Sequence, residues 1–333
     1  MQTTPVVKVT AAWLLCLLLI IAAFVAVVGS LNARLYSPEH RVDLYLDALR
    51  QGEGGRALGI LNATVPDGSD ASLLDGDALR ASAAPLEGTT IQDALDTGQD
   101  TVEVPVTYSV DGEDHTTLFP LEQTGTRWGV FETWELEPSV LPTVGISTRH
   151  GEDASVNGVD VGLPGGNAEL ASFYPGAVAA RYDTPYLVSS EEHTVVTGTG
   201  SPAPLELSPE QTPDLARAVD DQVHTFLDAC ADQAVFQPAG CPFAYVTTEP
   251  LAGDIVWTIE EYPTVTVTRE GDDWTVAPLE GSARLETTLQ SYFSGAETDV
   301  SDVVDFSFDA DLAVTGDEVT LIPIITVTGD VSG

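Results

Sequence analysis

The sequence predicts an α+β protein with one N-terminal transmembrane helix and two α+β domains on either side of a small all-β module. Residues 9–31 hold no ionisable side chain except the thiol of Cys16. Residues 37–138 and 209–333 each begin with apolar positions at helical spacing and continue with alternating ones, which is typical of a helix followed by antiparallel strands. Residues 139–200 show no helical period, so they are expected to form strands and turns alone.

The apolar run is long enough to cross a bilayer. As a helix, residues 9–31 rise about 35 Å at about 1.5 Å per residue, more than the roughly 30 Å of a hydrocarbon core. A cleaved signal peptide is the alternative, because Val28-Gly29-Ser30 resembles a cleavage site, but its apolar region normally spans about 7–15 residues. We therefore predict an uncleaved single-pass anchor in the cell membrane, with residues 1–8 in the cytoplasm.

The side of the membrane on which the remainder lies is not decided by flanking charge. Lys8 precedes the run and Arg34 and Arg41 follow it, and long domains translocate largely regardless of such charges. Beyond the anchor, Cys230 and Cys241 form either one disulfide in an oxidising compartment or two buried thiols. A disulfide closing a loop of about 12 residues stabilises a domain by roughly 3 kcal/mol. Because Lys8 is also the only lysine, an extracytoplasmic location is favoured.

The charge excludes several classes of partner. The chain has 52 acidic and 12 basic residues and a formal net charge of −40. Such a charge argues against binding to nucleic acid and against docking on anionic lipid. It suits a saline setting, a cationic partner or divalent ions at an anionic cell wall, or it simply keeps a solvated surface soluble. Hydrophobic residues make up 43% of the chain, enough for packed cores.

The first α+β domain, residues 37–138, is expected to begin with helices. Ser37-Pro38-Glu39 is typical of a helix start. The apolar face of that helix is formed by Val42, Tyr45, Leu46 and Leu49. Its end is predicted at Gly52, Gly54 and Gly55. Further helices are expected at 57–61 and near 73–83.

Strands follow in this domain. The apolar positions of residues 102–110 alternate with polar ones, which predicts a strand with one buried face. Asp111-Gly112 supplies a hairpin turn. Two more strands are expected at 117–121 and 128–136.

In the β module, residues 139–200, turns are expected at Asn157-Gly158, Gly165-Gly166 and Pro175-Gly176. Ser201-Pro202-Ala203-Pro204 then predicts a stiff proline linker over 201–208.

The second α+β domain, residues 209–333, repeats this order. An apolar stripe predicts a long helix running toward Cys230, and it consists of Leu215, Val219, Val223, Phe226 and Leu227. Strands are expected at 255–259, 264–269, 274–278 and 319–327, and over the alternating residues Phe306, Phe308, Ala310, Leu312 and Val314.

One hexapeptide recurs in the two α+β domains. Residues 125–130 (GTRWGV) match 271–276 (GDDWTV), and in both a turn glycine precedes a tryptophan and a valine predicted on one strand face. This match suggests a duplicated domain.

Taken together, these features resemble known families. Two helices and a meander ending in G-x-x-W-x-V resemble the NTF2-like (cystatin-like) superfamily. Residues 155–162 (SVNGVDVG), followed by 173–176 (FYPG), resemble the small β domain of PEGA and TcaA-like envelope proteins, although Val178 and Ala179 stand where a second Tyr usually follows. Cys230 and Cys241-Pro242-Phe243 resemble an element of uncharacterised single-span actinobacterial membrane proteins. The resemblance implies a non-enzymatic envelope protein, and TcaA-like proteins are tied to the cell-wall antibiotic response.

The sequence holds no clear catalytic constellation. It has no G-x-S-x-G motif, Walker loop or Rossmann glycine run. NTF2-like folds host enzymes whose Asp base lies in a cone-shaped pocket, and Tyr45, Asp47 and Asp228 could enter one, although a solvated helix face explains each better. The histidines are scattered without metal-ligand spacing: His40, His115, His150, His193 and His224.

Two further patterns are discounted. Asp67, Asp70, Asp75 and Asp77 lack the regular spacing and the terminal Glu of a calcium loop. Asn62-Ala63-Thr64 matches a glycosylation acceptor only formally, because the context looks bacterial. We expect no catalytic, cofactor or metal residues.

Three functions remain open. The first is a non-enzymatic, membrane-anchored envelope protein whose extracytoplasmic domains bind wall polymers or envelope proteins. The second is an NTF2-like enzyme or small-molecule binder, and the third is an acidic structural spacer.

Overall fold

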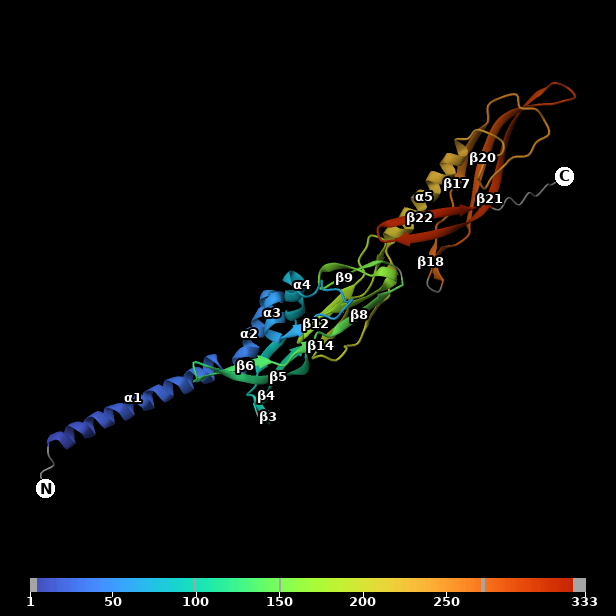
Figure 1. Ribbon diagram of the computed structural model, residues 1–333. Coiled ribbons are helices and arrows are strands. Elements are labelled where there is room, and N and C mark those ends of the chain that lie inside the picture. The colour runs from blue at the N-terminus through green and yellow to red at the C-terminus, as the bar shows by residue number, and fades with distance from the viewer. Residues whose placement is uncertain (1–4, 99, 150, 271–272, 326–333) are drawn as a thin grey trace. The chain divides into compact units, whose positions relative to one another are not determined.

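The computed structural model describes residues 5–98, 100–149, 151–270 and 273–325, without the side chains of residues 5–12, 33 and 34 (Figure 1). The chain forms two compact units. Unit 1 comprises Met1–Ser147, Ala154–Arg181 and Glu191–Leu207, and unit 2 comprises Thr148–Asp153, Tyr182–Ser190 and Ser208–Gly333. Each combines helix with β-sheet, so the α+β class is confirmed. The domain boundaries of the sequence analysis stay a prediction.

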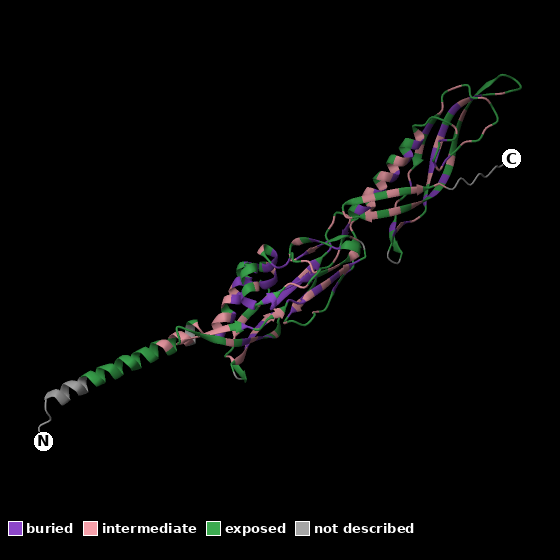
Figure 2. Ribbon diagram, viewed as in Figure 1, coloured by how far each residue is buried: buried purple, intermediate pink, exposed green. Residues whose placement is uncertain are grey.

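The N-terminal helix α1 (Pro5–Leu35) contains the apolar run. Its stretch Trp13–Asn32 has a mean hydropathy of 3.0, and none of it is buried. Figure 2 shows the described part of the helix exposed along most of its length. This helix is therefore long and apolar enough to cross a membrane, and a signal sequence near an N-terminus has the same properties.

Helix α2 (Pro38–Gln51) starts and buries its face as predicted. The Oγ of Ser37 accepts the N–H of His40 at 3.2 Å, and Gly52 ends the helix with φ 70°. The apolar face listed above is buried. Gly54 and Gly55 do not stop this helix but open α3 (Gly54–Leu61), because Asp75 Oδ1 accepts the Gly54 N–H at 2.8 Å.

The third helix, expected near 73–83, begins later, as α4 (Gly76–Ala83).

Helices α2 and α3 pack on a sheet of the order β2-β4-β5-β6, in which β3 also pairs with β4. Its strands are β2 (Glu87–Ile91), β3 (Leu95–Gly98), β4 (Thr101–Val110), β5 (Glu113–Arg127) and β6 (Phe131–Leu136). Alternate β4 side chains from Val104 to Val110 are buried, as predicted. The Asp111-Gly112 turn has φ values of 51° and 82°, the left-handed pair that a tight two-residue hairpin requires.

The tryptophan of the first hexapeptide does not lie on a strand face. Strand β5 continues to Arg127, so Trp128 and Gly129 form the turn to β6, with φ values of 55° and 74°. Trp128 is 78% exposed, whereas Trp274 lies on β19 (Asp273–Val276) and is 8% exposed. The predicted common placement is therefore wrong for Trp128, and residues 271–272 of the second hexapeptide lie outside the described residues.

In the described part of unit 1, the other regular elements are strands and one 3-10 helix, Pro164–Gly166. Two sheets have the orders β10-β9-β12-β14 and β11-β8-β15, and β1 pairs with β7 in parallel. The strands are β1 (Ala63–Thr64), β7 (Ser139–Val140), β8 (Thr143–Thr148), β9 (Asp153–Val156), β10 (Val159–Gly162), β11 (Asn167–Ala171), β12 (Gly176–Arg181), β14 (Glu192–Val196) and β15 (Leu205–Leu207). Asn157-Gly158 turns between β9 and β10, as predicted, with φ values of 47° and 79°.

The residues predicted as a proline linker, 201–208, include strand β15. Leu205 and Leu207 are buried, and β15 is the neighbour of β8 in its sheet. The alternation of two leucines around Glu206 outweighs the preceding prolines, because it gives the segment a buried face. Residues 201–204 and 208 lack strand structure.

Unit 2 places α5 (Pro213–Ala231) beside a sheet of the order β17-β20-β21-β19-β18, in which β22 also pairs with β21. The strands are β17 (Val256–Glu261), β18 (Val267–Glu270), β19, β20 (Leu279–Gln290), β21 (Glu297–Thr315) and β22 (Glu318–Ile324); short β13 (Leu187–Val188) pairs with β16 (Glu210–Gln211). Four members of the predicted α5 stripe are buried, and Phe226 is half-buried. Residues 326–327 of the last predicted strand lie outside the described residues.

Candidate functional site

The polar residues considered for an enzymatic pocket have local structural partners. Tyr45 is fully buried, and its hydroxyl donates to the backbone oxygen of Tyr174 at 2.7 Å. Burial raises the pKa of Tyr45 well above its ordinary value. Asp47 is half exposed and lies 3.7 Å from Arg50, and Asp228 accepts a hydrogen bond from Tyr262. These contacts give each of the three side chains a structural role that requires no substrate.

The aspartates that imitate a calcium loop also form hydrogen bonds or ion pairs with nearby residues. Asp70 Oδ1 accepts the N–H of Ser72 at 2.7 Å, Asp75 binds the start of α3, and Asp77 pairs with Arg80. Within the described residues, no group of three or more His, Cys, Asp or Glu side chains is placed to hold a metal ion.

A disulfide joins Cys230 and Cys241, whose Cα atoms lie 5.8 Å apart. Cys230 is in the last turn of α5, and both residues are buried. Gln233 supports the enclosed loop, because its Oε1 accepts the N–H of Ala239 at 2.8 Å and its Nε2 lies 3.3 Å from Cys241 Sγ. The bridge therefore fixes the end of α5 to the segment that follows it.

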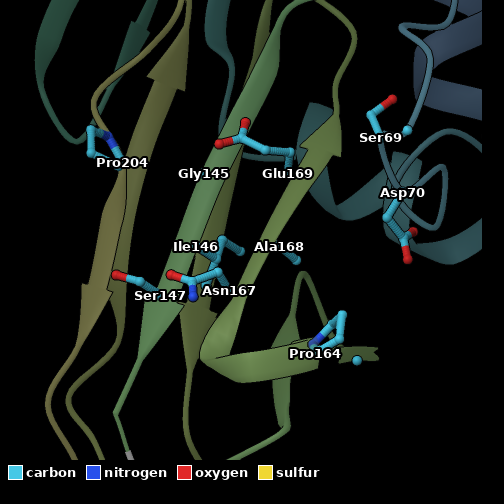
Figure 3. A pocket seen from close by; sticks show the side chains of 12 residues that line it. Ser69, Asp70, Gly145, Ile146, Ser147, Pro164, Asn167, Ala168, Glu169 and Pro204 are labelled. Atoms are coloured by element: carbon cyan, nitrogen blue, oxygen red, sulfur yellow. The ribbon is translucent and has the colours of Figure 1, made fainter.

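A groove of about 680 Å³ lies on the β8–β11 face of unit 1 (Figure 3). The loop 68–70 extends this sheet, because Asp70 N–H donates to Glu169 O at 2.8 Å and Ala171 N–H donates to Asp70 O at 2.9 Å. In Figure 3, Pro204 and this loop lie on opposite sides of β8 and β11. A volume of this size is typical of small-molecule sites, which span about 300–1,000 Å³.

The polar side chains that line the groove include two carboxylates and two serine hydroxyls. The Glu169 carboxylate lies over Gly145, where a Cβ would come within 3.1 Å of Glu169 Oε1. A side chain at position 145 would therefore press on that carboxylate. Asp70 is the second acid, and Ser69, Ser147 and Asn167 add hydrogen-bonding groups. The lining favours a cationic or polyhydroxylated ligand over an anionic one.

An aromatic hairpin tip is the most exposed apolar feature of unit 2. Tyr292 and Phe293 lie between β20 and β21 and are 74% and 104% exposed. Ser291 closes the turn, donating to Ala296 O and accepting from Gly295 N, both at 2.9 Å. Exposed aromatic side chains are enriched among the residues that carry binding energy at protein interfaces. We define Ser291–Ala296 as the aromatic tip.

Sequence reasoning missed both features. The aromatic tip could have been found from the local sequence. A Tyr-Phe pair between serines and next to a glycine indicates a turn that carries two large apolar side chains. No local sequence pattern indicates the groove, because residues 68–70 and 145–169 are far apart in the sequence and come together only when the chain folds.

A third feature lies beside the end of α1. A pocket of about 250 Å³ is lined by Tyr36, His40, Arg41, Glu132 and Trp134, among others. It lies between the start of α2 and β6. Arg41 Nε and Trp134 Nε1 are buried there without a hydrogen-bond partner. Buried N–H groups are normally paired, so this pocket can accept an oxygen-bearing group.

The comparisons with known proteins do not place the chain in a family. No protein-family model matches it, and no curated protein matches it. One solved structure, described as an "Ntf2 like protein involved in plasmid conjugation", is 11% identical and has a TM-score of 0.16. The match covers 72% of this chain and 77% of that one. A TM-score this low carries no argument about fold or function, and none of these comparisons supports the TcaA-like or PEGA resemblance.

Proposed function

We propose that this protein is a non-enzymatic, single-pass envelope protein whose head lies outside the cell membrane and binds wall components or protein partners. The observation that carries this proposal is the helix α1, whose stretch Trp13–Asn32 is strongly apolar and wholly unburied. A helix of this kind is stable in lipid and unfavourable in water. The Cys230–Cys241 disulfide supports an oxidising location for the head.

The finer architecture belongs to the same proposal. Two NTF2-like domains would flank a PEGA- or TcaA-like β module, with residues 1–8 in the cytoplasm. The space between α2 and the sheet of unit 1 is occupied by Tyr45 and Phe119, whose ring centroids lie 5.6 Å apart. This filled core favours binding by surface features over an NTF2-like enzyme or binder that uses a cone-shaped pocket.

Thiol labelling of intact cells tests the topology. In a Cys16→Ala chain, a membrane-impermeant maleimide is expected to label Cys230 and Cys241 only after an impermeant reductant is added. A Cys16→Ala/Tyr292→Cys chain is the matched control, because its exposed thiol should react without reductant. Labelling of either chain only after lysis would place the head in the cytoplasm and overturn the proposal. The intact mass of the chain, measured in both the membrane and the soluble fraction, tests cleavage near residues 28–30.

A second candidate function is small-molecule binding in the groove of unit 1. The observation in its favour is the volume of about 680 Å³ with two carboxylates, Asp70 and Glu169. Titration with amino sugars and oligoamines, followed by NMR or calorimetry, tests it. Binding that Glu169→Gln weakens and Glu192→Gln leaves unchanged would support the groove, whereas equal weakening by both would indicate a general charge effect.

A further inference from the structure

The turn between β5 and β6 is attached to the end of the apolar helix. Asn32 Nδ2 donates to the backbone oxygen of Val130 at 3.0 Å. The ring of Tyr36 stacks on Phe131, with centroids 4.6 Å apart. Asn32 is the residue at which the apolar stretch ends. We call Arg127–Phe131 the juxtamembrane turn. If α1 crosses a bilayer, these contacts hold the turn at the level where the helix leaves the hydrocarbon.

The juxtamembrane turn presents a tryptophan away from the protein. Trp128 has φ 55°, a left-handed conformation that bulky residues seldom adopt, and its side chain is 78% exposed. The Arg127 guanidinium lies 5.3 Å from the centroid of the Trp128 ring. In membrane proteins tryptophan is enriched at the boundary between lipid and water, because its ring is apolar and its N–H donates to polar groups.

A second observation at the same end of unit 1 points to a ligand with oxygen acceptors. Arg41 and Trp134 line the pocket beside Tyr36 together with Glu132 and Glu135, and Arg41 Nε and Trp134 Nε1 are buried without a hydrogen-bond partner. Phosphate and ester oxygens of lipid head groups can accept from such donors. Strand β6 begins at Phe131, the last residue of the juxtamembrane turn, and continues into residues that line the pocket, so one lipid layer can reach both.

We propose that the juxtamembrane turn and this pocket form a membrane-contact surface that rests in the phospholipid head groups of the leaflet facing the head. The proposal rests on the proposed function, because it requires α1 to span the bilayer. Arg127 is the only ionisable side chain of the turn, whereas Glu132 and Glu135 line the pocket beside Arg41, so the surface carries charges of both signs. Phosphodiester groups of zwitterionic lipid fit the surface better than a strongly anionic bilayer does.

Site-directed fluorescence in vesicles tests this contact. The full chain carrying Cys16→Ala is reconstituted in phosphatidylcholine vesicles, and an environment-sensitive fluorophore is attached at Trp128→Cys, Ile20→Cys or Tyr292→Cys. Nitroxide-labelled head groups are expected to quench the label at 128 at least twofold more than the label at 292. Nitroxides deep in the acyl chains are expected to quench the label at 20.

The outcomes separate the two proposals. Equal quenching at 128 and 292, with the label at 20 in the acyl region, overturns the membrane contact and leaves the anchor intact. A label at 20 that acyl-chain nitroxides do not reach overturns both. A label at 128 that is shielded only in native membranes, and not in pure lipid vesicles, assigns the turn to a protein partner and also overturns the inference.

Discussion

The hydroxyl of Tyr262 donates to Asp228 on α5, and the Tyr262 ring stacks on His224 with centroids 3.9 Å apart. The hydrogen bond to Asp228 is the main reason that the pKa of Tyr262 is raised to about 12; burial and the charge of Asp228 add to it. A tyrosine whose pKa is higher in the folded state holds its proton more tightly there. Its contribution to stability is complete below about pH 10 and is lost as the pH rises through about 12.

In Tyr262→Phe, the free energy of unfolding is therefore expected to fall less between about pH 10 and pH 12 than in the wild type. Because Tyr262 is near the surface, solvent screening limits the effect to about 0.5 kcal/mol. Urea unfolding at several alkaline pH values measures it, and Tyr292→Phe, at a 74% exposed position, is the control. Parallel curves for the wild type and Tyr262→Phe would contradict the prediction.

Tyr45 tests whether a buried hydroxyl is structural or catalytic. Tyr45→Phe removes the donor to Tyr174 O in a fully buried position, and we expect a loss of about 1–2 kcal/mol in the free energy of unfolding. Denaturant unfolding of the full chain in detergent measures the loss. An unchanged stability would mean that the hydroxyl is not needed by the fold, and would restore the enzymatic interpretation.

At the scale of elements, the packing of α4 on β12 depends on a glycine. A Cβ at Gly176 would lie 2.6 Å from Ser82 Oγ and 2.9 Å from Phe173 O. Gly176→Ala is expected to destabilise unit 1 by about 1–3 kcal/mol, because the helix and the strand must move apart. Gly59→Ala, in α3 with no atom near the added Cβ, is the control and is expected to be neutral or stabilising by up to about 1 kcal/mol.

A fragment of residues 139–200, which lacks α4, tests whether the α4 contact causes the effect of Gly176→Ala. If Gly176→Ala lowered the melting temperature of an isolated 139–200 fragment as much as that of the full chain, the α4 contact would not be the cause.

The disulfide belongs to the same scale, since it fixes the end of α5. Reduction is expected to lower the free energy of unfolding by about 2–4 kcal/mol. Calorimetry of the Cys16→Ala chain with and without reductant measures the change, and the Cys230→Ala/Cys241→Ala chain should match the reduced form. A reduced chain as stable as the oxidised one would show that the bridge adds nothing to the fold.

Elements with a strong local pattern could be predicted from the sequence, and the others could not. Helix α2 has a capping serine and a clean apolar face, and β4 alternates without interruption. Strand β20 was missed although its buried positions alternate from Ala283 to Leu289, because Gly281 and Ser282 precede them and Thr287 is polar, which interrupts the apolar pattern. Trp128 was predicted on a strand and lies in a turn, because a match between two hexapeptides does not distinguish a strand from the turn that ends it. The groove depends on long-range pairing of the loop 68–70 with β11, which no local pattern reports.

At the scale of the whole molecule, 52 acidic side chains face only 12 basic ones, so most of the negative charge has no basic partner. Ion pairs among the described residues, such as Arg50–Asp47 at 3.7 Å and Arg56–Glu53 at 2.8 Å, join partly exposed side chains. Pairs of this kind contribute about 0–1 kcal/mol each. Repulsion among the many unpaired carboxylates therefore outweighs the attraction that these pairs supply, and the folded state is destabilised by its own charge.

Salt should consequently stabilise this protein. Raising the ionic strength from about 0.01 M to about 1 M shortens the screening length from about 30 Å to about 3 Å, which suppresses the repulsion more than it weakens the few ion pairs. We expect a higher melting temperature in sodium chloride, most of the gain below about 0.2 M, and no comparable gain with sucrose at equal osmolality. A melting temperature that falls with salt would mean that attractive pairs dominate. It would also remove the physical basis of the acidic-spacer alternative, in which uncompensated charge holds the head away from an anionic envelope.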